Sequence, residues 1–228
     1  MSDGFARLPA PMRCDAVRGY WTLLRERRAG LCCKRTLDVA LSGLMIVALS
    51  PLLAGLAVAV KCGSRGPVFY RQKRVTKNMR EFRIFKFRSM VADADRIGPL
   101  VTVGDDPRVT RIGAFLRRTR LDELPQLFNV FAGDMTFVGT RPEVPKYVAA
   151  YTDEMKATLL MRAGITSPAS IAYKDEAALL DGAADPDRVY IEEILPAKME
   201  YNLRYLREFS FFGDLKIMLR TVGAVAKE

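Results

Sequence analysis

The longest apolar stretch of the chain is a run of 22 uncharged residues from Val39 to Val60, VALSGLMIVALSPLLAGLAVAV. A helix of this length, rising about 1.5 Å per residue, would just cross a hydrocarbon layer of roughly 30 Å. Pro51 interrupts the run, where a proline removes a backbone donor and clashes with the preceding turn. The pattern therefore predicts either a kinked span or a helix that enters the membrane, breaks at Ser50-Pro51 and turns back.

Basic residues flank this run on both sides. They are Arg25, Arg27, Arg28, Lys34 and Arg35 before it, and Lys61, Arg65, Arg71, Lys73 and Arg74 after it. Because basic residues prefer the cytoplasmic side, a single span should have one basic flank. Two basic flanks favour re-entry, and the Ser50 hydroxyl can bond a carbonyl that Pro51 leaves without a donor.

The remaining pattern predicts one α/β domain, mostly helical with a small β-hairpin. Alternating apolar and polar residues predict strands at 68–74 and 81–90, joined by a turn at 77–80. Apolar residues at helical spacing predict helices at 17–28, 91–97, 108–119, 121–131, 143–161, 196–207 and 211–225, with a loop at 98–107. The last two helices are amphipathic, which suits either a membrane interface or packing on the domain's own core.

Charge and residue usage narrow the possible chemistry. The chain has 36 Lys and Arg against 26 Asp and Glu, a net charge of +10, which favours a polyanionic partner such as nucleic acid, an acidic membrane or a phosphate-bearing substrate. It has no histidine, which excludes Ser-His and Cys-His catalysis. Its four cysteines lack CxxC spacing, so neither a disulfide framework nor a zinc site is predicted.

The strongest candidate for chemistry lies within RRTRLDELPQLFNVFAGDMTFVGTRPE, from Arg117 to Glu143. Asp122 and Glu123 are adjacent and Pro125 follows, which predicts that the pair lies near a helix N-terminus, where anions are favoured. Nearby arginines should lower the pKa of Asp122 and match phosphate oxygens. An ionised aspartate there can attack a phosphoryl group, with Mg²⁺ held by Asp122 and Glu123. Taken alone, however, such a dipeptide is more often a capping device.

Several longer motifs occur in fixed order over residues 34 to about 220. They are KRTLDV…SPLL, GPVFYRQKRV, FKFRSM, LDELPQLFNV, GDMTFVGTRPE and GITSPAS. With these motifs the chain resembles the bacterial sugar transferases, the small monotopic phosphoglycosyl transferases. Residues 1–33, which precede these motifs, are predicted to be a basic N-terminal extension. The resemblance implies a re-entrant helix at 34–61 broken at Ser50-Pro51, and a cytosolic catalytic domain at 62–228. It places the protein on the cytoplasmic face of the bacterial inner membrane.

The resemblance also implies an activity. A sugar 1-phosphate would pass from a UDP-sugar to undecaprenyl phosphate, a polyprenol phosphate, with release of UMP and with Mg²⁺ as cofactor. This step would initiate a surface glycan such as exopolysaccharide, capsule, O-antigen or glycoprotein glycan. Carried over by motif, Asp122 is the nucleophile and Glu123 its partner. The matching phosphate-binding residues are Arg117, Arg141 and Pro142, with Lys86 and Arg88 facing the same basic pocket.

The implied partners are the two substrates and membrane phospholipid, without nucleic acid, and a homodimer remains open. The chain departs from the family pattern at Thr140, where a proline is usual before Arg141-Pro142. The competing interpretation is a non-catalytic, membrane-tethered basic module that binds anionic lipid or nucleic acid. It explains the charge and the anchor but gives Asp122-Glu123-x-Pro125 no purpose.

Overall fold

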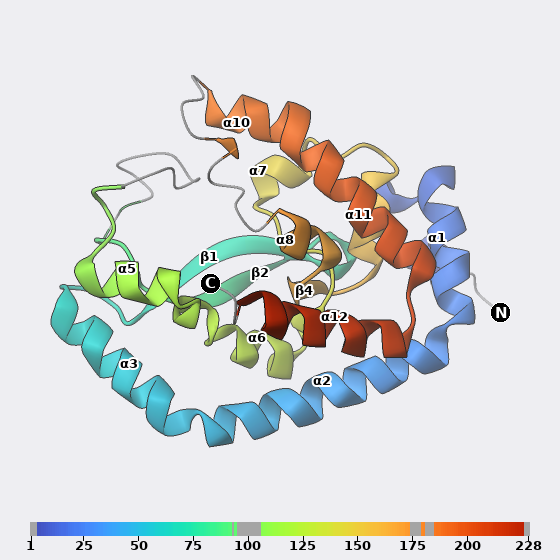
Figure 1. Cartoon of the computed structure of the whole chain (residues 1–228). Coiled ribbons are helices and arrows are strands. Elements are labelled where there is room, and N and C mark those ends of the chain that lie inside the picture. The colour runs from blue at the N-terminus through green and yellow to red at the C-terminus, as the bar shows by residue number, and fades with distance from the viewer. Residues whose placement is uncertain (1–3, 93, 95–105, 174–178, 181–184, 226–228) are drawn as a thin grey trace.

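The computed structural model describes residues 4–92, 94, 106–173, 179–180 and 185–225. Helices predominate among them, around two small sheets, which confirms the predicted mostly helical α/β class (Figure 1). The longer elements are α1 (Asp15–Glu26), α2 (Arg28–Ala48), α3 (Ser50–Gly63), β1 (Phe69–Thr76), β2 (Arg80–Phe87), α5 (Arg111–Arg118), α6 (Gln126–Ala132), β3 (Met135–Val138), β4 (Ala163–Thr166), α11 (Leu195–Glu208) and α12 (Phe211–Val225). Shorter helices are η1 (Gly4–Arg7), η2 (Ala10–Met12), η3 (Lys77–Met79), η4 (Leu121–Glu123), α7 (Pro145–Val148), η5 (Met155–Leu160), α8 (Pro168–Ala172), α10 (Pro186–Val189) and η6 (Tyr190–Ile194).

The predicted hairpin is confirmed. β1 and β2 pair antiparallel from Phe69 opposite Phe87 to Thr76 opposite Arg80. The 3-10 helix η3 makes the turn, and within it Asn78 has a positive φ of 56°, which asparagine tolerates better than most residues. Because side chains alternate along a strand, Tyr70, Gln72 and Arg74 share one face of β1.

The helix predicted at 143–161 is wrong. The structure has the short α7, the 3-10 helix η5 and, after them, β4, which pairs parallel with β3. Parallel neighbours need a crossover connection, and residues 139–162 supply it with two short helical turns. Buried residues in both turns, among them Tyr147 and Ala157, produce the apolar spacing that resembles one long helix.

The N-terminal residues belong to the main core. Val17, Tyr20 and Leu24 of α1 are buried in the same cluster as β3 and α11. The Tyr20 hydroxyl donates a hydrogen bond to Glu154 at 2.6 Å. The amphipathic helix predicted at 17–28 is confirmed as α1, but it packs on the body of the protein, and α2 begins at Arg28, inside the segment predicted as an extension.

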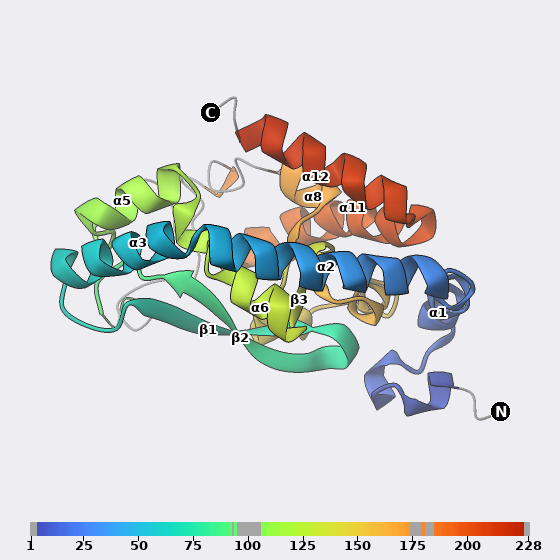
Figure 2. The same cartoon turned by 90° about the horizontal axis from the view of Figure 1, so that it is seen from below.

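The apolar run forms a bent pair of helices, α2 and α3, that meet at Leu49. The two helix axes differ in direction by 64°, and the bend between them is visible in Figure 1. Figure 2 shows the pair running across one side of the molecule. Among the described residues no single helix is long and apolar enough to cross a bilayer, whereas α2 and α3 together meet that criterion. Pro51 lies in the first turn of α3, and the Ser50 hydroxyl donates a hydrogen bond to the carbonyl of Val47 at 2.8 Å, as predicted.

The two C-terminal helices are confirmed and differ in how they pack. α11 contributes five residues to the main core, including Met199, Leu203 and Leu206. α12 lies beside α2, and its apolar residues Phe212 and Leu219 remain 78% and 74% exposed. The helices predicted at 108–119 and 121–131 are also present, as α5 and as η4 with α6. The helix at 91–97 and the loop at 98–107 lie mostly outside the described residues.

Candidate active site

A turn between α5 and α6 carries the predicted carboxylate pair. Asp122 and Glu123 lie in the 3-10 helix η4, and Pro125 immediately precedes the first residue of α6. The turn follows Arg120, whose φ of 57° lies in the left-handed region. The pair is therefore next to the N-terminal end of α6, as Pro125 predicts, although the 3-10 turn and not α6 itself holds it.

Glu123 is held by two cations from distant segments. Lys86 of β2 donates a hydrogen bond to Glu123 Oε1 at 2.7 Å. Arg141, in the loop after β3, donates to the same oxygen and also to Oε2, at 3.4 Å. The hairpin, the η4 turn and the loop after β3 therefore meet at one carboxylate.

The ionisation of Glu123 follows from these contacts. Burial alone would raise the pKa of Glu123, but the charges and hydrogen bonds of Arg141 and Lys86 outweigh it and hold the pKa well below its usual range. Burial lowers the pKa of Lys86, and the charge of Glu123 opposes that change. Near neutral pH Glu123 is thus a charged anchor for its two cations.

Asp122 has a different environment. It is 7% exposed, and burial raises its pKa, with Lys86, Arg117 and Arg141 opposing the rise and Glu123 adding to it. The predicted lowering of this pKa is therefore wrong, because burial outweighs the surrounding cations. Within the described part of the chain no hydrogen bond to the Asp122 carboxylate is found, so its oxygens are available to another group.

The sequence matches a known protein family over most of its length. A model of the family described as bacterial sugar transferase matches residues 29–228. The chain belongs to the bacterial sugar transferase family.

Three curated relatives are similar to this chain over more than four fifths of its length. A UDP-N-acetylgalactosamine-undecaprenyl-phosphate N-acetylgalactosaminephosphotransferase of Aeromonas hydrophila is 36% identical over 84% of this chain and 43% of its own length. A UDP-glucose:undecaprenyl-phosphate glucose-1-phosphate transferase of Escherichia coli is 38% identical over 83% of this chain and 39% of its own. The exopolysaccharide production protein ExoY of Sinorhizobium fredii is 30% identical over 84% of each chain. The chain thus spans about two fifths of the length of the first two.

The remaining predicted site residues have different surroundings in the structure. Arg117 lies in the last turn of α5, near enough for its charge to oppose part of the rise in the pKa of Asp122. Pro142 is buried, and its carbonyl accepts a hydrogen bond from Arg74 at 2.9 Å. Thr140 is buried too, and its hydroxyl has no hydrogen-bond partner within the described residues.

Arg88 does not share the contacts of Lys86. Its guanidinium donates hydrogen bonds to the carbonyls of Pro67 and Ser64, the latter at 2.7 Å, and to the Ser64 hydroxyl at 2.8 Å. These bonds join the end of β2 to the C-terminal end of α3. The structure therefore brings Lys86 to Glu123, whereas Arg88 connects β2 to the C-terminal end of α3.

The sequence did not single out a second set of polar residues behind Arg141. The buried Glu143 and Tyr190 form this group together with the partly buried Arg74. Two of them stand in the motifs RQKR and RPE, so the motifs themselves were the available signal. Their pairing depends on the fold, because Tyr190 is 47 residues from Glu143 in the chain.

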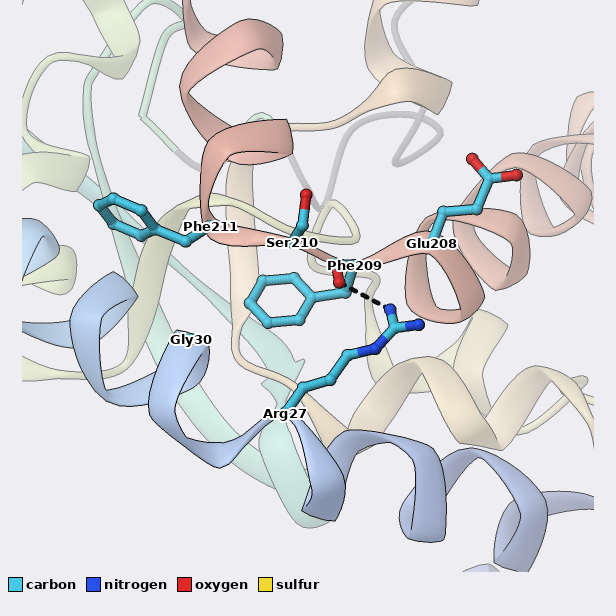
Figure 3. Close-up of a pocket in the computed structure, with 6 residues that line it drawn as sticks. All are labelled: Arg27, Gly30, Glu208, Phe209, Ser210 and Phe211. Carbon is cyan, nitrogen blue, oxygen red and sulfur yellow. Dashed lines mark hydrogen bonds between the residues drawn. The ribbon is translucent and has the colours of Figure 1, made fainter.

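A pocket of about 430 Å³ opens elsewhere in the structure, where the start of α2 meets the link between α11 and α12 (Figure 3). Arg27 lies across it and donates a hydrogen bond to the carbonyl of Phe209 at 2.6 Å. The predicted site residues do not line this pocket. It therefore plays no part in the chemistry considered for Asp122.

The predicted Mg²⁺ ligands fit unequally. Among the described residues no group of three or more acidic, histidine or cysteine side chains could hold a metal ion by itself. Both oxygens of Glu123 already accept hydrogen bonds from cations, whereas Asp122 is available. Mg²⁺ commonly uses one or two carboxylates and completes its shell with substrate phosphates and water. Asp122 fits such a shared site, and Glu123 fits it poorly.

Proposed function

We propose that this sugar transferase moves a sugar 1-phosphate from a UDP-sugar to undecaprenyl phosphate and releases UMP. The observation that carries the proposal is the contrast within the carboxylate pair: Glu123 is tied to Lys86 and Arg141, while Asp122 is buried among the same cations with its oxygens available. The named relatives from A. hydrophila and E. coli use UDP-sugars and undecaprenyl phosphate, which supports the substrate classes.

The proposed reaction has two balanced displacements. An oxygen of Asp122 attacks the β-phosphorus of the donor, and the bond from that phosphorus to the bridging oxygen breaks with its electron pair leaving on UMP. A phosphate oxygen of the lipid then attacks the same phosphorus, and Asp122 leaves as a carboxylate. Arg117 and Arg141 would bind phosphate oxygens, and Glu123, itself held by Lys86, would hold Arg141 in place. When bound, Mg²⁺ would neutralise part of the diphosphate charge.

A screen of UDP-sugars tests this function. Purified protein with undecaprenyl phosphate is incubated with each donor, and both UMP and an organic-extractable labelled lipid are measured. We expect equal amounts of the two products with at least one donor. UMP without labelled lipid would contradict transfer and indicate hydrolysis, and no product with any common UDP-sugar would contradict the function.

Removal of the divalent metal should stop the reaction. EDTA is expected to lower transfer by about 100-fold or more, since a metal contributes several kcal/mol to stabilising phosphoryl charge. Added Mg²⁺ should restore the rate, and EDTA saturated with Mg²⁺ beforehand is the control. Full activity in EDTA would contradict a requirement for a divalent metal.

For the bent helix pair we propose re-entry into the membrane, with both flanks on the cytoplasmic face. The 64° bend and the basic residues on both sides support this arrangement. The apolar side chains Leu44, Val47 and Val58 are exposed on the two helices, where they would contact lipid.

Cysteines already present allow a topology test. Cys33 and Cys62 are exposed and lie on opposite sides of the apolar run. In single-cysteine variants, an impermeant maleimide is expected to label both positions in inside-out vesicles and neither in intact spheroplasts. Labelling after detergent provides the total for each variant. Labelling of one position from each side would establish a span instead.

A further inference from the structure

A second charged cluster lies directly behind Arg141. Its centre is Glu143, whose Oε1 accepts a hydrogen bond from the Tyr190 hydroxyl at 2.5 Å. Lys198 Nζ lies 3.7 Å from the same carboxylate oxygen and donates to the Tyr190 hydroxyl at 3.0 Å. Glu143, Tyr190 and Lys198 are all less than 9% exposed. With Arg74 these residues are called the Glu143 cluster below.

Arg74 connects this cluster to the hairpin. Its guanidinium lies 3.9 Å from Glu143 Oε2 and donates a hydrogen bond to the carbonyl of Pro142 at 2.9 Å. The next residue of β1, Val75, donates its backbone N–H to the carbonyl of Glu143 at 2.9 Å. β1 therefore holds the two residues that follow Arg141.

The residues before Arg141 are fixed as well. Gly139 donates its backbone N–H to Thr166, and Thr140 accepts from the backbone N–H of Gly164, both at 2.9 Å. The two backbones are so close that a Cβ on Gly164 would lie 2.2 Å from the nitrogen of Gly139. Arg141 thus stands between two fixed stretches of backbone, with its guanidinium directed to Glu123.

We propose that Glu143 is a positioning residue, which Tyr190, Lys198 and Arg74 hold in place so that Arg141 points at Glu123 and at the phosphates of the donor. The inference rests on the proposed function, because it assigns Arg141 a phosphate to bind. It deepens that function by naming residues, one from η6 and one from α11, that act on the site through Arg141.

The chemistry of the cluster favours positioning over stability alone. Burying a carboxylate with its cations gains little over apolar residues of similar size, since desolvation offsets the attraction. Hydrogen bonds of defined length and direction do, however, fix geometry in a way that apolar contacts do not. A displacement of about 1 Å at a reacting group can lower a rate by about 100-fold.

Tyr190→Phe is the variant that tests the proposal, and Tyr147→Phe is its matched control. The two rings pack with their centroids 4.6 Å apart, both residues are buried, and both hydroxyls donate to a carboxylate at 2.5 Å. The Tyr147 hydroxyl bonds Asp187, which is outside the Glu143 cluster. We expect kcat/KM for the UDP-sugar to fall about 10- to 100-fold in Tyr190→Phe and to stay near wild type in Tyr147→Phe.

A double-mutant cycle separates positioning from a general structural effect. In an Arg141→Met background, Tyr190→Phe is expected to cause no further loss in kcat/KM, because the residue it positions is gone. Glu143→Gln, which keeps an acceptor for the Tyr190 hydroxyl, should retain more activity than Glu143→Ala. Equal losses in both tyrosine variants, or a Tyr190→Phe loss that persists in the Arg141→Met background, would overturn the proposal. Absence of transfer by the wild-type protein would overturn the proposed function. Transfer by the wild type with either of the two results just named would overturn only the positioning role of Glu143.

Discussion

Asp122→Asn is expected to lose transfer from UDP-sugar to lipid by more than about 1,000-fold, because a neutral amide cannot replace the attacking carboxylate. UMP release should fall in parallel, since in the proposed sequence UMP leaves only when Asp122 attacks. The measurement is labelled lipid and UMP from the same reaction. Transfer at the wild-type rate would contradict a covalent role for Asp122.

The stability of the same variant distinguishes lost chemistry from lost structure. Burial raises the pKa of Asp122, which means that the folded protein disfavours its ionised form. Asp122→Asn should therefore unfold at the wild-type temperature or above it. Glu123→Gln should destabilise the protein, because Arg141 and Lys86 hold the pKa of Glu123 low and so stabilise its ionised form. We expect the free energy of unfolding to fall by about 1.5–3 kcal/mol.

Lys34→Met is expected to lower the free energy of unfolding by about 3–5 kcal/mol, because it leaves a buried carboxylate without its cation. Lys34 Nζ donates to Asp214 Oδ2 at 2.5 Å and to the carbonyl of Val138 at 2.6 Å. Both side chains of the pair are less than 10% exposed. The pair joins α2, the first half of the bent helix pair, to α12 and to the end of β3. Chemical denaturation in detergent or nanodiscs measures the change.

The pH dependence of that loss has a definite sign. Burial raises the pKa of Asp214 above 3.8, and Lys34 lowers it, so its removal should raise the pKa further. Between the two pKa values of Asp214, the folded state of Lys34→Met binds more protons than the unfolded state. The free energy of unfolding of this variant therefore rises as the pH falls toward the pKa that Asp214 has in the unfolded chain. We expect the loss in free energy of unfolding, relative to wild type, to be smaller at about pH 5 than at about pH 7.

Two further results bear on the same pair. The double variant Lys34→Met with Asp214→Leu should recover most of the loss, since replacing both partners of a buried pair is often neutral. A deficit in Lys34→Met that is unchanged or larger at the lower pH would contradict the role assigned to Asp214.

Much of the fold could be predicted because local signals mark its elements. The alternation at 68–74 and 81–90 marks the hairpin, and Thr110 caps α5 by accepting from the N–H of Gly113. Ser50-Pro51 marks the bend between α2 and α3. Each of these features depends on residues close in sequence, so periodicity and the Ser-Pro break were sufficient to predict the hairpin, the helix at 108–119 and the bend. The Thr110 cap, which was not predicted, sets the start of α5 at Arg111, three residues after the predicted start.

The errors arise where distant segments meet. The pairing of β3 with β4 joins residues about 28 positions apart, and the short strands carry no period of their own. The rise in the pKa of Asp122 depends on burial, which a motif does not reveal. The place of Arg88 depends on the end of α3, more than 20 residues earlier. By contrast, Asp122, Glu123 and Arg141 were found because the motifs that contain them are long and ordered.

Asp122 is proposed to carry the sugar phosphate between the two substrates, and a reaction without the lipid acceptor would reveal that intermediate. Purified protein is mixed with its UDP-sugar alone, and UMP and the intact mass of the protein are followed together. We expect UMP in an amount close to that of the protein, and a phosphosugar on the peptide that contains Asp122, which added undecaprenyl phosphate then removes. UMP formed only when the lipid is present, with no modified peptide, would contradict it.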